Sequence, residues 1–311
     1  MDYITREVLV EPTPNVYELS GQTIEELKQL STTLSPPTIF ESEKLEQDLT
    51  NSYREALLNI PAIRPLYKKM QTDLTSERNA RGYIIIDGVP SGENYDNMTM
   101  PTAFCALVGR SFVMAPKNGF WQNLGVDLRA ITYRFQGVGE NPFHIDAVNT
   151  TKPPDYLSLY GVRIDPAGGG MSTLSNLQAM VEKLDPEEID YLQIPRYSEG
   201  QFYDMTGVGK EYKLFPVLEQ EDNGLWFVRY TGKMIPEMSE SYDKLLFTKI
   251  GVLLDINKES FMLQQGQLLI ANQRIMAHGR EPLGPGQEKI DPSQQRYLRQ
   301  SYIRADDSSM H

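Results

Sequence analysis

Apolar residues recur at three- and four-residue spacings along the first third of the chain. The segments 23–34 (TIEELKQLSTTL) and 42–60 (SEKLEQDLTNSYREALLNI) both have this period, which is typical of amphipathic helices. The segment 82–90 (GYIIIDGVP) is a short apolar run closed by Gly and Pro, and it predicts a buried strand. The segment 97–112 (NMTMPTAFCALVGRSF) predicts a further helix, packed against a sheet.

From residue 129 onward the pattern changes to short runs rich in aromatic and β-branched residues, which predict β-strands. The runs are 129–136, 155–164, 211–219, 225–232, 266–273 and 296–304. Turn-forming sequences such as 165–170 (DPAGGG) separate the runs, as expected for connections between strands. The segment 213–230 predicts a hairpin across the Asp-Asn-Gly sequence at 222–224, because such residues favour tight hairpin turns.

Helices in the first part and strands in the rest predict an α+β protein built on a β-sandwich or barrel. One late helix is expected at 241–256, and no repeat, low-complexity tract or break in composition marks a linker. We therefore expect a single domain over 1–311, with a mainly helical part at 1–128 packed on a strand-rich core at 129–305.

The composition narrows the classes of partner. The net charge is −12, and hydrophobic and charged residues make up 40% and 23% of the chain, ordinary proportions for a globular protein. An acidic chain argues against a nucleic-acid or anionic-membrane partner, because both select a basic surface. With no apolar stretch as long as a membrane span and no secretory leader, we expect a cytoplasmic protein. The one cysteine, Cys105, is expected to be a buried apolar side chain.

The histidines provide the first sign of chemistry. There are three, of which His311 ends the chain. His144 and Asp146 are two residues apart, so in an extended segment both side chains lie on one face, with Cα atoms about 6.6 Å apart. His278 follows an apolar strand-like run, so a second strand could supply a third ligand. Two His and one carboxylate on one face of a metal, with open positions opposite, is the ligand set of non-haem Fe(II) oxygenases.

Each of these features alone has an ordinary explanation. An isolated His-x-Asp pair is more often a histidine that is hydrogen-bonded to a nearby acid beside a turn. An isolated histidine such as His278 is more often a surface or core residue whose hydrogen bonds are made within the protein. The combination favours the metal site, because His144, Asp146 and His278 lie in two segments that together match a known pattern.

The segments 144–163 (HIDAVNTTKPPDYLSLYGVR) and 266–282 (GQLLIANQRIMAHGREP) carry that pattern. They resemble the clavaminate synthase-like branch of the 2-oxoglutarate oxygenases, a branch that includes amino-acid hydroxylases and is related to the taurine dioxygenase-like branch. The resemblance is good over residues 130–305, whereas the N-terminal third matches the family only in its general sequence pattern. It implies a double-stranded β-helix core (jelly-roll, cupin-like) with flanking helices, and iron held by His144, Asp146 and His278.

The resemblance also implies residues for the co-substrate. In the family, an arginine on the strand after the distal histidine binds the far carboxylate of 2-oxoglutarate. An arginine suits a carboxylate because the guanidinium group can donate two parallel hydrogen bonds to it. The matching residue is Arg296, although the loop 284–295 looks like an insertion and leaves Arg299 as an alternative. Three residues apart on a strand, the two arginines face opposite sides and cannot both serve.

Other site residues follow from the same resemblance. The family's hydroxyl donor after a Gly pair corresponds to Thr173, with Ser172 next to it; the alternative is a plain Gly-rich turn that starts a helix. Arg280 matches the family's His-Gly-Arg and is expected either to orient the co-substrate or substrate or to form a structural ion pair. Gln136 and Asn149 flank the His-x-Asp segment and are candidates for contact with the substrate.

The implied activity is an Fe(II)- and 2-oxoglutarate-dependent dioxygenase that uses O2 and releases succinate and CO2. It would hydroxylate, desaturate or cyclise an amino acid or a small peptide-derived natural product. Two other classes of protein stay open. One is a non-catalytic cupin-like metal-binding protein. The other is a zinc hydrolase with a His2Asp site, although the H-E-x-x-H sequence that is common in zinc hydrolases is absent. The sequence leaves the substrate, the regiochemistry and the oligomeric state undetermined.

Protons are expected to compete with the metal. Both histidines must be neutral to bind it, so we expect iron affinity to fall below about pH 6, with up to two protons taken up for each metal lost. Asp146 is expected to add a proton only near about pH 4.

Overall fold

The computed structural model of the chain describes residues 14–37, 45, 47–77, 80–92, 97–114, 119–131, 136–198 and 214–306. The helices are α1 (Gly21–Ser31), α2 (Gln47–Leu58), α3 (Ile63–Asp73), α4 (Thr99–Cys105), α5 (Leu177–Val181), α6 (Pro186–Leu192) and α7 (Ser241–Ile256), with the 3-10 helices η2 (Gly232–Glu237) and η3 (Gln287–Lys289). The strands are β1 (Val16–Glu18), β2 (Tyr83–Asp87), β3 (Gly109–Phe112), β4 (Gln122–Leu124), β5 (Asn141–His144), β6 (Tyr156–Arg163), β7 (Ser172–Asn176), β8 (Leu218–Gln220), β9 (Trp226–Val228), β10 (Glu259–Phe261), β11 (Leu268–Asn272), β12 (Met276–Arg280) and β13 (Tyr297–Ala305).

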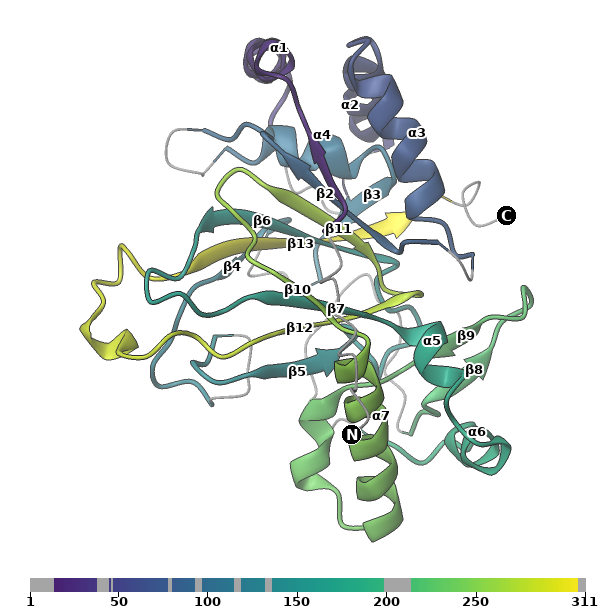
Figure 1. Ribbon diagram of the computed structural model, residues 1–311. Helices are drawn as coiled ribbons and strands as arrows, with labels where there is room; N and C mark the ends of the chain where they lie inside the picture. The colour runs from purple at the N-terminus through teal and green to yellow at the C-terminus, as the bar shows by residue number, and fades with distance from the viewer. Residues whose placement is uncertain are drawn as a thin grey trace, which may run out of the picture.

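Two sheets form the centre of this mixed α+β fold. The larger has seven strands in the order β1-β2-β11-β6-β13-β3, with β4 paired to β13, and the smaller has four in the order β10-β7-β12-β5. In Figure 1 the helices α1 to α4 lie over one side of the larger sheet, the smaller sheet lies on its other side, and α7 lies beyond the smaller sheet. The hairpin β8-β9 is a separate two-stranded sheet beside α5.

The apolar side chains of the larger sheet are divided between its two faces. On β11, Leu268 and Ile270 pack in the cluster with the N-terminal helices, whereas Leu269 and Ala271 pack in the cluster between the sheets. This alternation follows from the two-residue period of a strand. A strand that is buried on both faces reads as a continuous apolar run, which explains why the run at 266–273 predicts a strand.

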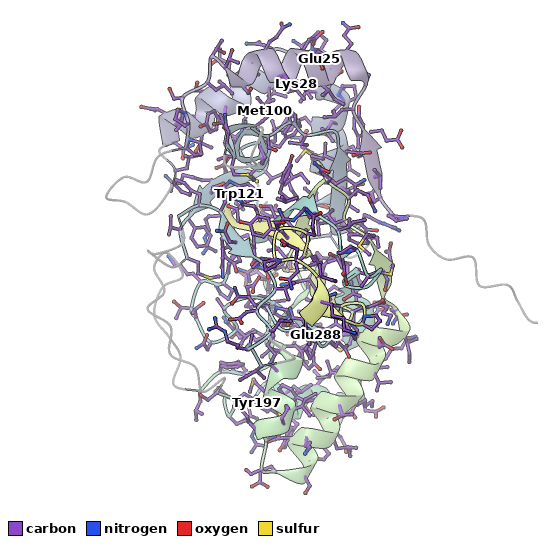
Figure 2. All side chains as sticks on the ribbon, turned by 90° about the vertical axis from the view of Figure 1, so that its left-hand side faces the viewer. Glu25, Lys28, Met100, Trp121, Tyr197 and Glu288 are labelled. Carbon is purple, nitrogen blue, oxygen red and sulfur yellow. The ribbon has the colours of Figure 1, made fainter. Side chains whose placement is uncertain are left out.

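A further apolar cluster covers the outer face of the smaller sheet. Phe143 of β5 and Ala277 of β12 pack there with Phe247 and Ile250 of α7. Tyr197 also packs on Phe247, with ring centroids 5.0 Å apart. Figure 2 places Tyr197 near the α7 end of the molecule and Lys28, on α1, at the opposite end. The smaller sheet is therefore fixed from both sides, and its inner face is the one that faces the larger sheet.

Most of the predicted elements are confirmed. Helices α1, α2 and α7, strand β2 and the β8–β9 hairpin lie where the sequence predicts them. The helix predicted for 97–112 is wrong in its second half, because α4 ends at Cys105 and 109–112 form β3 on the edge of the larger sheet. A Cβ at Gly109 would lie 2.2 Å from the carbonyl oxygen of Arg304, so glycine permits the close approach of β3 to β13.

Three smaller expectations have different outcomes. Of the strand expected at 129–136, residues 132–135 lie outside the described residues, and 129–131 belong to no helix or strand. Cys105 is fully buried, as expected, and burial raises the pKa of its thiol to about 12. Among the described residues, no helix combines the length and the apolar character needed to cross a membrane.

Candidate metal centre

His144 and His278 are brought together by the pairing of β5 with β12. The two strands are antiparallel, and His144 lies directly opposite His278. Paired residues project to the same face of a sheet, and the imidazole rings lie with centroids 4.2 Å apart. Leu174, which also pairs with His278, packs in the cluster between the sheets, so the two histidines point into the space between the two sheets.

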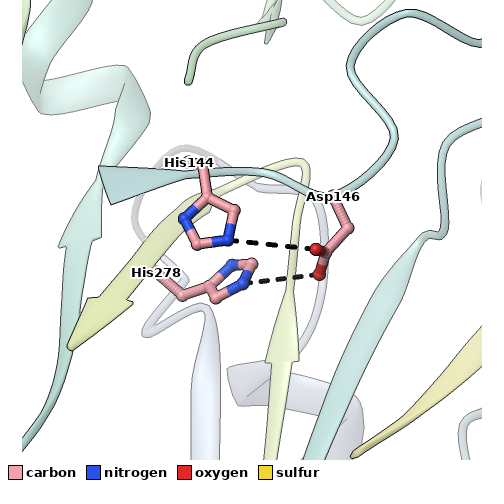
Figure 3. Close-up of side chains that lie close together, drawn as sticks. All are labelled: His144, Asp146 and His278. Carbon is pink, nitrogen blue, oxygen red and sulfur yellow. Dashed lines mark ion pairs between the residues drawn. The ribbon is translucent and has the colours of Figure 1, made fainter. Parts of the chain in front are cut away.

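Asp146 completes a group of three (Figure 3). Its Oδ1 lies 3.9 Å from Nε2 of His144, and its Oδ2 lies 3.4 Å from Nε2 of His278. The strand ends at His144, so Asp146 lies in a turn rather than in the extended segment considered from the sequence. The next residue, Ala147, has a φ of 57°, a left-handed conformation that is uncommon for a non-glycine residue and is often found at functional sites.

The three side chains fit a divalent metal ion. One atom from each lies within 4.8 Å of the others, and three ligands on one face of a metal at about 2.1 Å are themselves about 3 Å apart. Nδ1 of His144 lies 2.8 Å from the carbonyl oxygen of Pro142. Because a carbonyl only accepts, Nδ1 carries the proton and Nε2 keeps the lone pair that would bind a metal.

Burial controls the charge of this group. It lowers the pKa of His278 to about 3 and that of His144 well below its usual range, and the positive charge of Lys233 lowers both further. Burial raises the pKa of Asp146 to about 6, while the charge of Lys233 acts in the opposite sense. Both imidazoles are therefore neutral at neutral pH and ready to bind a metal, while the carboxyl group is ionised above about pH 6.

Two glutamines hold Asp146 in position, one at its backbone N–H and one at its carboxylate, and sequence reasoning missed both. The backbone N–H of Asp146 donates to Oε1 of Gln273 at 2.8 Å, and Nε2 of Gln300 donates to Oδ2 of Asp146 at 3.3 Å. Gln273 lies in the turn between β11 and β12, and Gln300 lies on β13. Residues that orient a ligand in this way also tune its affinity for the metal. Gln273 lies within the 266–282 segment that matches the family pattern, whereas Gln300 lies outside it.

The Pro-Asp-Tyr sequence holds the turn that carries Gln273. Asp155 is buried, and its carboxylate forms ion pairs with Arg274 at 3.4 Å and with Arg304 at 3.1 Å. Its carbonyl oxygen also accepts from the N–H of Gln273 at 2.9 Å. Asp155 therefore joins the start of β6, the β11–β12 turn and the end of β13, so its part in the site is to fix the position of Gln273.

Arg280 and Arg296 form a buried pair of cations, and Arg280 lies on the same face of β12 as His278. Arg280 follows His278 on β12, and Arg296 directly precedes β13. Burial lowers the pKa of Arg296 to about 9, with the charge of Arg280 as a second cause, and it lowers the pKa of Arg280 to about 10. The charge of Asp165 acts in the opposite sense on both. Two neighbouring buried cations are costly without an anion, so this corner of the site suits a carboxylate.

The surroundings of the two arginines are specific. Arg280 donates to the carbonyl oxygens of Gly137, at 2.7 Å, and Gly139; its Nε is buried and, among the described residues, has no hydrogen-bond partner. A Cβ at Gly170 would lie 2.9 Å from Cδ of Arg296, so glycine at 170 makes room for that side chain. An unpaired donor on a buried guanidinium is costly, which supports an anionic ligand at this place.

The register of β7 places Ser172, rather than Thr173, on the face of the metal ligands. Ser172 pairs with Arg280 and Leu174 with His278, whereas Thr173 pairs with Gly279. A Cβ at Gly279 would lie 2.8 Å from Oγ1 of Thr173, so this hydroxyl lies on the other face of the sheet. The structure therefore does not bring Thr173 together with the other predicted site residues, and the buried hydroxyl beside Arg280 is that of Ser172.

The remaining candidates lie around the site at different positions. Arg299 is on the face of β13 opposite to Gln300 and Leu298, because successive strand residues alternate; it therefore points away from Asp146. The carbonyl oxygen of Gln136 accepts from the N–H of Asp127 at 2.9 Å, and Asn149 is buried in the turn after Asp146. For Gln136 and Asn149, contact with a substrate stays a prediction.

Comparison with known proteins gives a family and a set of similar folds. Residues 45–302 match the family described as "Taurine catabolism dioxygenase TauD, TfdA family". An asparagine oxygenase in complex with Fe(II), 2S,3S-3-hydroxyasparagine and succinate is 17% identical, with a TM-score of 0.70 and coverage of 93% of each chain. The non-haem iron oxygenase OrfP with Fe and alpha-ketoglutaric acid is 16% identical, with a TM-score of 0.67 and coverage of 94% of each chain. No curated protein sequence matches the chain.

Proposed function

Because the chain belongs to the TauD, TfdA family of dioxygenases, we propose that it is an Fe(II)- and 2-oxoglutarate-dependent hydroxylase of an amino acid or a small peptide-derived compound. The observation that carries the proposal is the group formed by His144, Asp146 and His278, whose ligand atoms lie within 4.8 Å of one another. Desaturation or ring closure of such a substrate belongs to the same proposal, since each begins at the same kind of unactivated C–H bond.

His144, Asp146 and His278 would hold the iron. Bound Fe(II), with 2-oxoglutarate and O2, supplies the oxidation and yields succinate and CO2. The protein provides neutral imidazoles, an ionised carboxylate that accepts from Gln300 and whose backbone N–H is held by Gln273, and an enclosed space between two sheets. Three ligands on one face leave positions open for the co-substrate.

Arg296 is the proposed anchor for the far carboxylate of 2-oxoglutarate. It is buried beside Arg280, and the buried hydroxyl of Ser172 lies opposite Arg280 on the adjacent strand. Two guanidinium groups and a hydroxyl give the charge-assisted bonds that a carboxylate needs when it leaves water. Ser172 takes the place expected for Thr173, because it is Ser172 that shares a face with Arg280.

The fold is proposed to be a jelly-roll, or double-stranded β-helix, core within one domain over 1–311. The support is the arrangement of a seven-stranded and a four-stranded sheet face to face, with the metal ligands on the inner face of the smaller one. In this proposal the helices of 1–128 stabilise the outer face of the larger sheet, and the core at 129–305 carries the chemistry.

The proposed substrate class takes support from the similar folds. The asparagine oxygenase is described with hydroxyasparagine, and OrfP with (3S)-hydroxy-L-Arg. A small-molecule substrate, with no nucleic-acid or membrane partner, also suits a chain of net charge −12. A cytoplasmic location is part of the same proposal.

Succinate release tests the proposal. Protein loaded with Fe(II), 2-oxoglutarate and O2 is incubated with a panel of amino acids and small peptides, and succinate is measured for each. We expect at least one compound to raise succinate release well above the substrate-free rate, and none to do so in His278→Ala. Metal binding without 2-oxoglutarate binding would favour a cupin-like binding protein, and Zn-dependent hydrolysis without O2 uptake would favour a zinc hydrolase.

A further inference from the structure

A short segment outside the predicted site residues extends the smaller sheet beside the metal centre. Thr231 forms an antiparallel bridge with His144, and the N–H of Ile145 donates to the carbonyl oxygen of Tyr230 at 3.0 Å. A Cβ at Gly232 would lie 2.9 Å from Cβ of Pro142, so the glycine lets this segment lie close against β5. The next residue, Lys233, is in the first turn of η2.

The hydroxyl of Thr231 is directed to the same face as the imidazole of His144, since bridged residues share a face. Thr231 is 1% exposed, and its Oγ1 has no hydrogen-bond partner among the described residues. A buried hydroxyl without a partner costs free energy. Its position beside a metal ligand therefore suggests that a bound molecule supplies the partner.

Lys233 is the cation next to the three metal ligands. Its charge acts on His144, Asp146 and His278, whereas Arg280 and Arg296 are not among the charges that act on these three. Electrostatic effects of this kind decline with distance and are screened by solvent, so the ammonium group lies near the ligands. Lys233 is half-buried, so its side chain is partly exposed to solvent.

Lys233 and Arg280 lie at different positions across the smaller sheet. Arg280 is on β12 and pairs with Ser172 of β7, whereas Thr231 lies across β5 from β12. The order across the sheet is therefore β7, β12, β5 and then the 230–231 segment. A co-substrate held by Arg280 and Arg296 leaves the Lys233 side for a second molecule.

We infer that Lys233, together with the hydroxyl of Thr231, binds a carboxylate group of the substrate. The inference rests on the proposed function and narrows its substrate to a small acid. That carboxylate is either the α-carboxylate of a free amino acid or a carboxylate on the side chain of the substrate. An ammonium group and a hydroxyl are both donors, and a carboxylate accepts from both.

Acetate and acetamide test the inference without knowledge of the natural substrate. Protein with Zn(II) and 2-oxoglutarate bound, and with ¹³C-labelled lysine, is titrated with each compound, and the NMR signals of Lys233 and Lys28 are followed. Lys28 is exposed on α1, at the far end of the molecule from α7 (Figure 2). We expect acetate to shift the Lys233 signal in a saturable manner, acetamide to leave it unchanged, and Lys28 to respond to neither. Equal responses to acetate and acetamide, or equal responses of the two lysines, would overturn the inference.

The isomers L-asparagine and L-isoasparagine distinguish the two sources of the carboxylate, because they differ in which carboxyl group is an amide. Their affinities are measured by calorimetry in wild type, Lys233→Gln, Thr231→Val and the control Lys28→Gln. We expect one isomer to lose about 10- to 100-fold in affinity in Lys233→Gln, the range for a charge-assisted bond, and less in Thr231→Val. If neither isomer loses affinity in Lys233→Gln, the inference is overturned.

The same samples separate this inference from the proposed function. Affinity for 2-oxoglutarate in Lys233→Gln should stay within about threefold of wild type, since its anchor is the arginine pair, and this also shows that the variant is folded. Wild-type protein that fails to bind 2-oxoglutarate contradicts the proposed function. Wild-type protein that binds 2-oxoglutarate but does not distinguish acetate from acetamide contradicts the inference alone.

Discussion

His144 and His278 lie directly opposite each other on the antiparallel strands β5 and β12, with ring centroids 4.2 Å apart. This pairing explains how residues far apart in the sequence would supply two ligands to one metal. A strand pair fixes both the separation and the shared face of its paired side chains. The turn after β5 carries Asp146, whose carboxylate is the third member of the group.

Gln273 should control the affinity of the metal site although it is not a ligand. Gln273→Leu removes the acceptor for the N–H of Asp146 while keeping a side chain of similar size. We expect Fe(II) affinity to fall about 10- to 100-fold, the usual cost of losing a group that orients a ligand. Calorimetric titration measures it, with the exposed Gln193→Leu as the matched control. Equal affinities in both variants would show that Gln273 does not position Asp146.

Arg296 should determine the affinity for 2-oxoglutarate. Arg296→Ala leaves a carboxylate unpaired in a buried site, which should weaken binding by about 2–5 kcal/mol. Arg296→Lys should also be impaired, because a point charge does not reproduce the guanidinium fork. Arg299→Ala is the control, since Arg299 points to the other face of β13. A large effect in Arg299→Ala with none in Arg296→Ala would reverse the assignment.

Ser172 should contribute a hydroxyl to the same ligand, and Thr173 should not. Ser172→Ala is expected to weaken 2-oxoglutarate binding by about 1.5–3 kcal/mol, the range for one hydrogen bond to a charged group. Thr173→Ala should leave binding nearly unchanged, because its hydroxyl lies on the outer face of β7. The two dissociation constants are measured side by side. The reverse order of effects would mean that the register of β7 is different at this place.

The proton released when a metal binds should come from Asp146. The pKa of His278 is lowered to about 3 and that of His144 well below its usual range, so neither carries a proton above about pH 5. The pKa of Asp146 is raised to about 6, so the metal-free site holds a proton there at lower pH and the metal displaces it. The release should therefore rise from near zero at about pH 7.5 to nearly one proton at about pH 5.

This differs from the two histidine protons expected from the sequence, because burial acts on the histidines and on the acid in opposite directions. Calorimetry of metal binding in buffers of different ionisation enthalpy counts the protons. A release near two at about pH 5 would show that a histidine is protonated there in addition to Asp146, and a release near zero would show that Asp146 is not protonated there.

The sequence predicts those parts of the fold that depend on local pattern. The apolar run of β11 and the late helix α7 are clear in it because each carries its own period or composition. The structure also brings together the three residues that the sequence proposes as metal ligands, which two short motifs carry. The helix predicted over 97–112 fails where Gly109 joins a sheet edge, because pairing with a distant strand outweighs local preference.

The side of a strand that a residue faces is harder to predict. Ser172 and Thr173 are neighbours with similar chemistry, and a shift of one residue reverses which of them faces the metal ligands. Gln273 and Gln300 contact Asp146 only because three distant segments converge. Neither contact has a local signal, since each depends on the packing of one sheet on the other.

An anaerobic titration with Fe(II) and then 2-oxoglutarate tests the central claim most directly. Calorimetry is used on wild type and on His144→Ala, Asp146→Ala and His278→Ala. We expect one Fe(II) per chain in wild type, a loss of at least about 100-fold in each variant because too few ligands remain for an open site, and 2-oxoglutarate binding that depends on the metal. If two of the three variants bind Fe(II) as tightly as wild type, or if 2-oxoglutarate binds equally well without metal, this site does not hold iron for an oxygenase reaction.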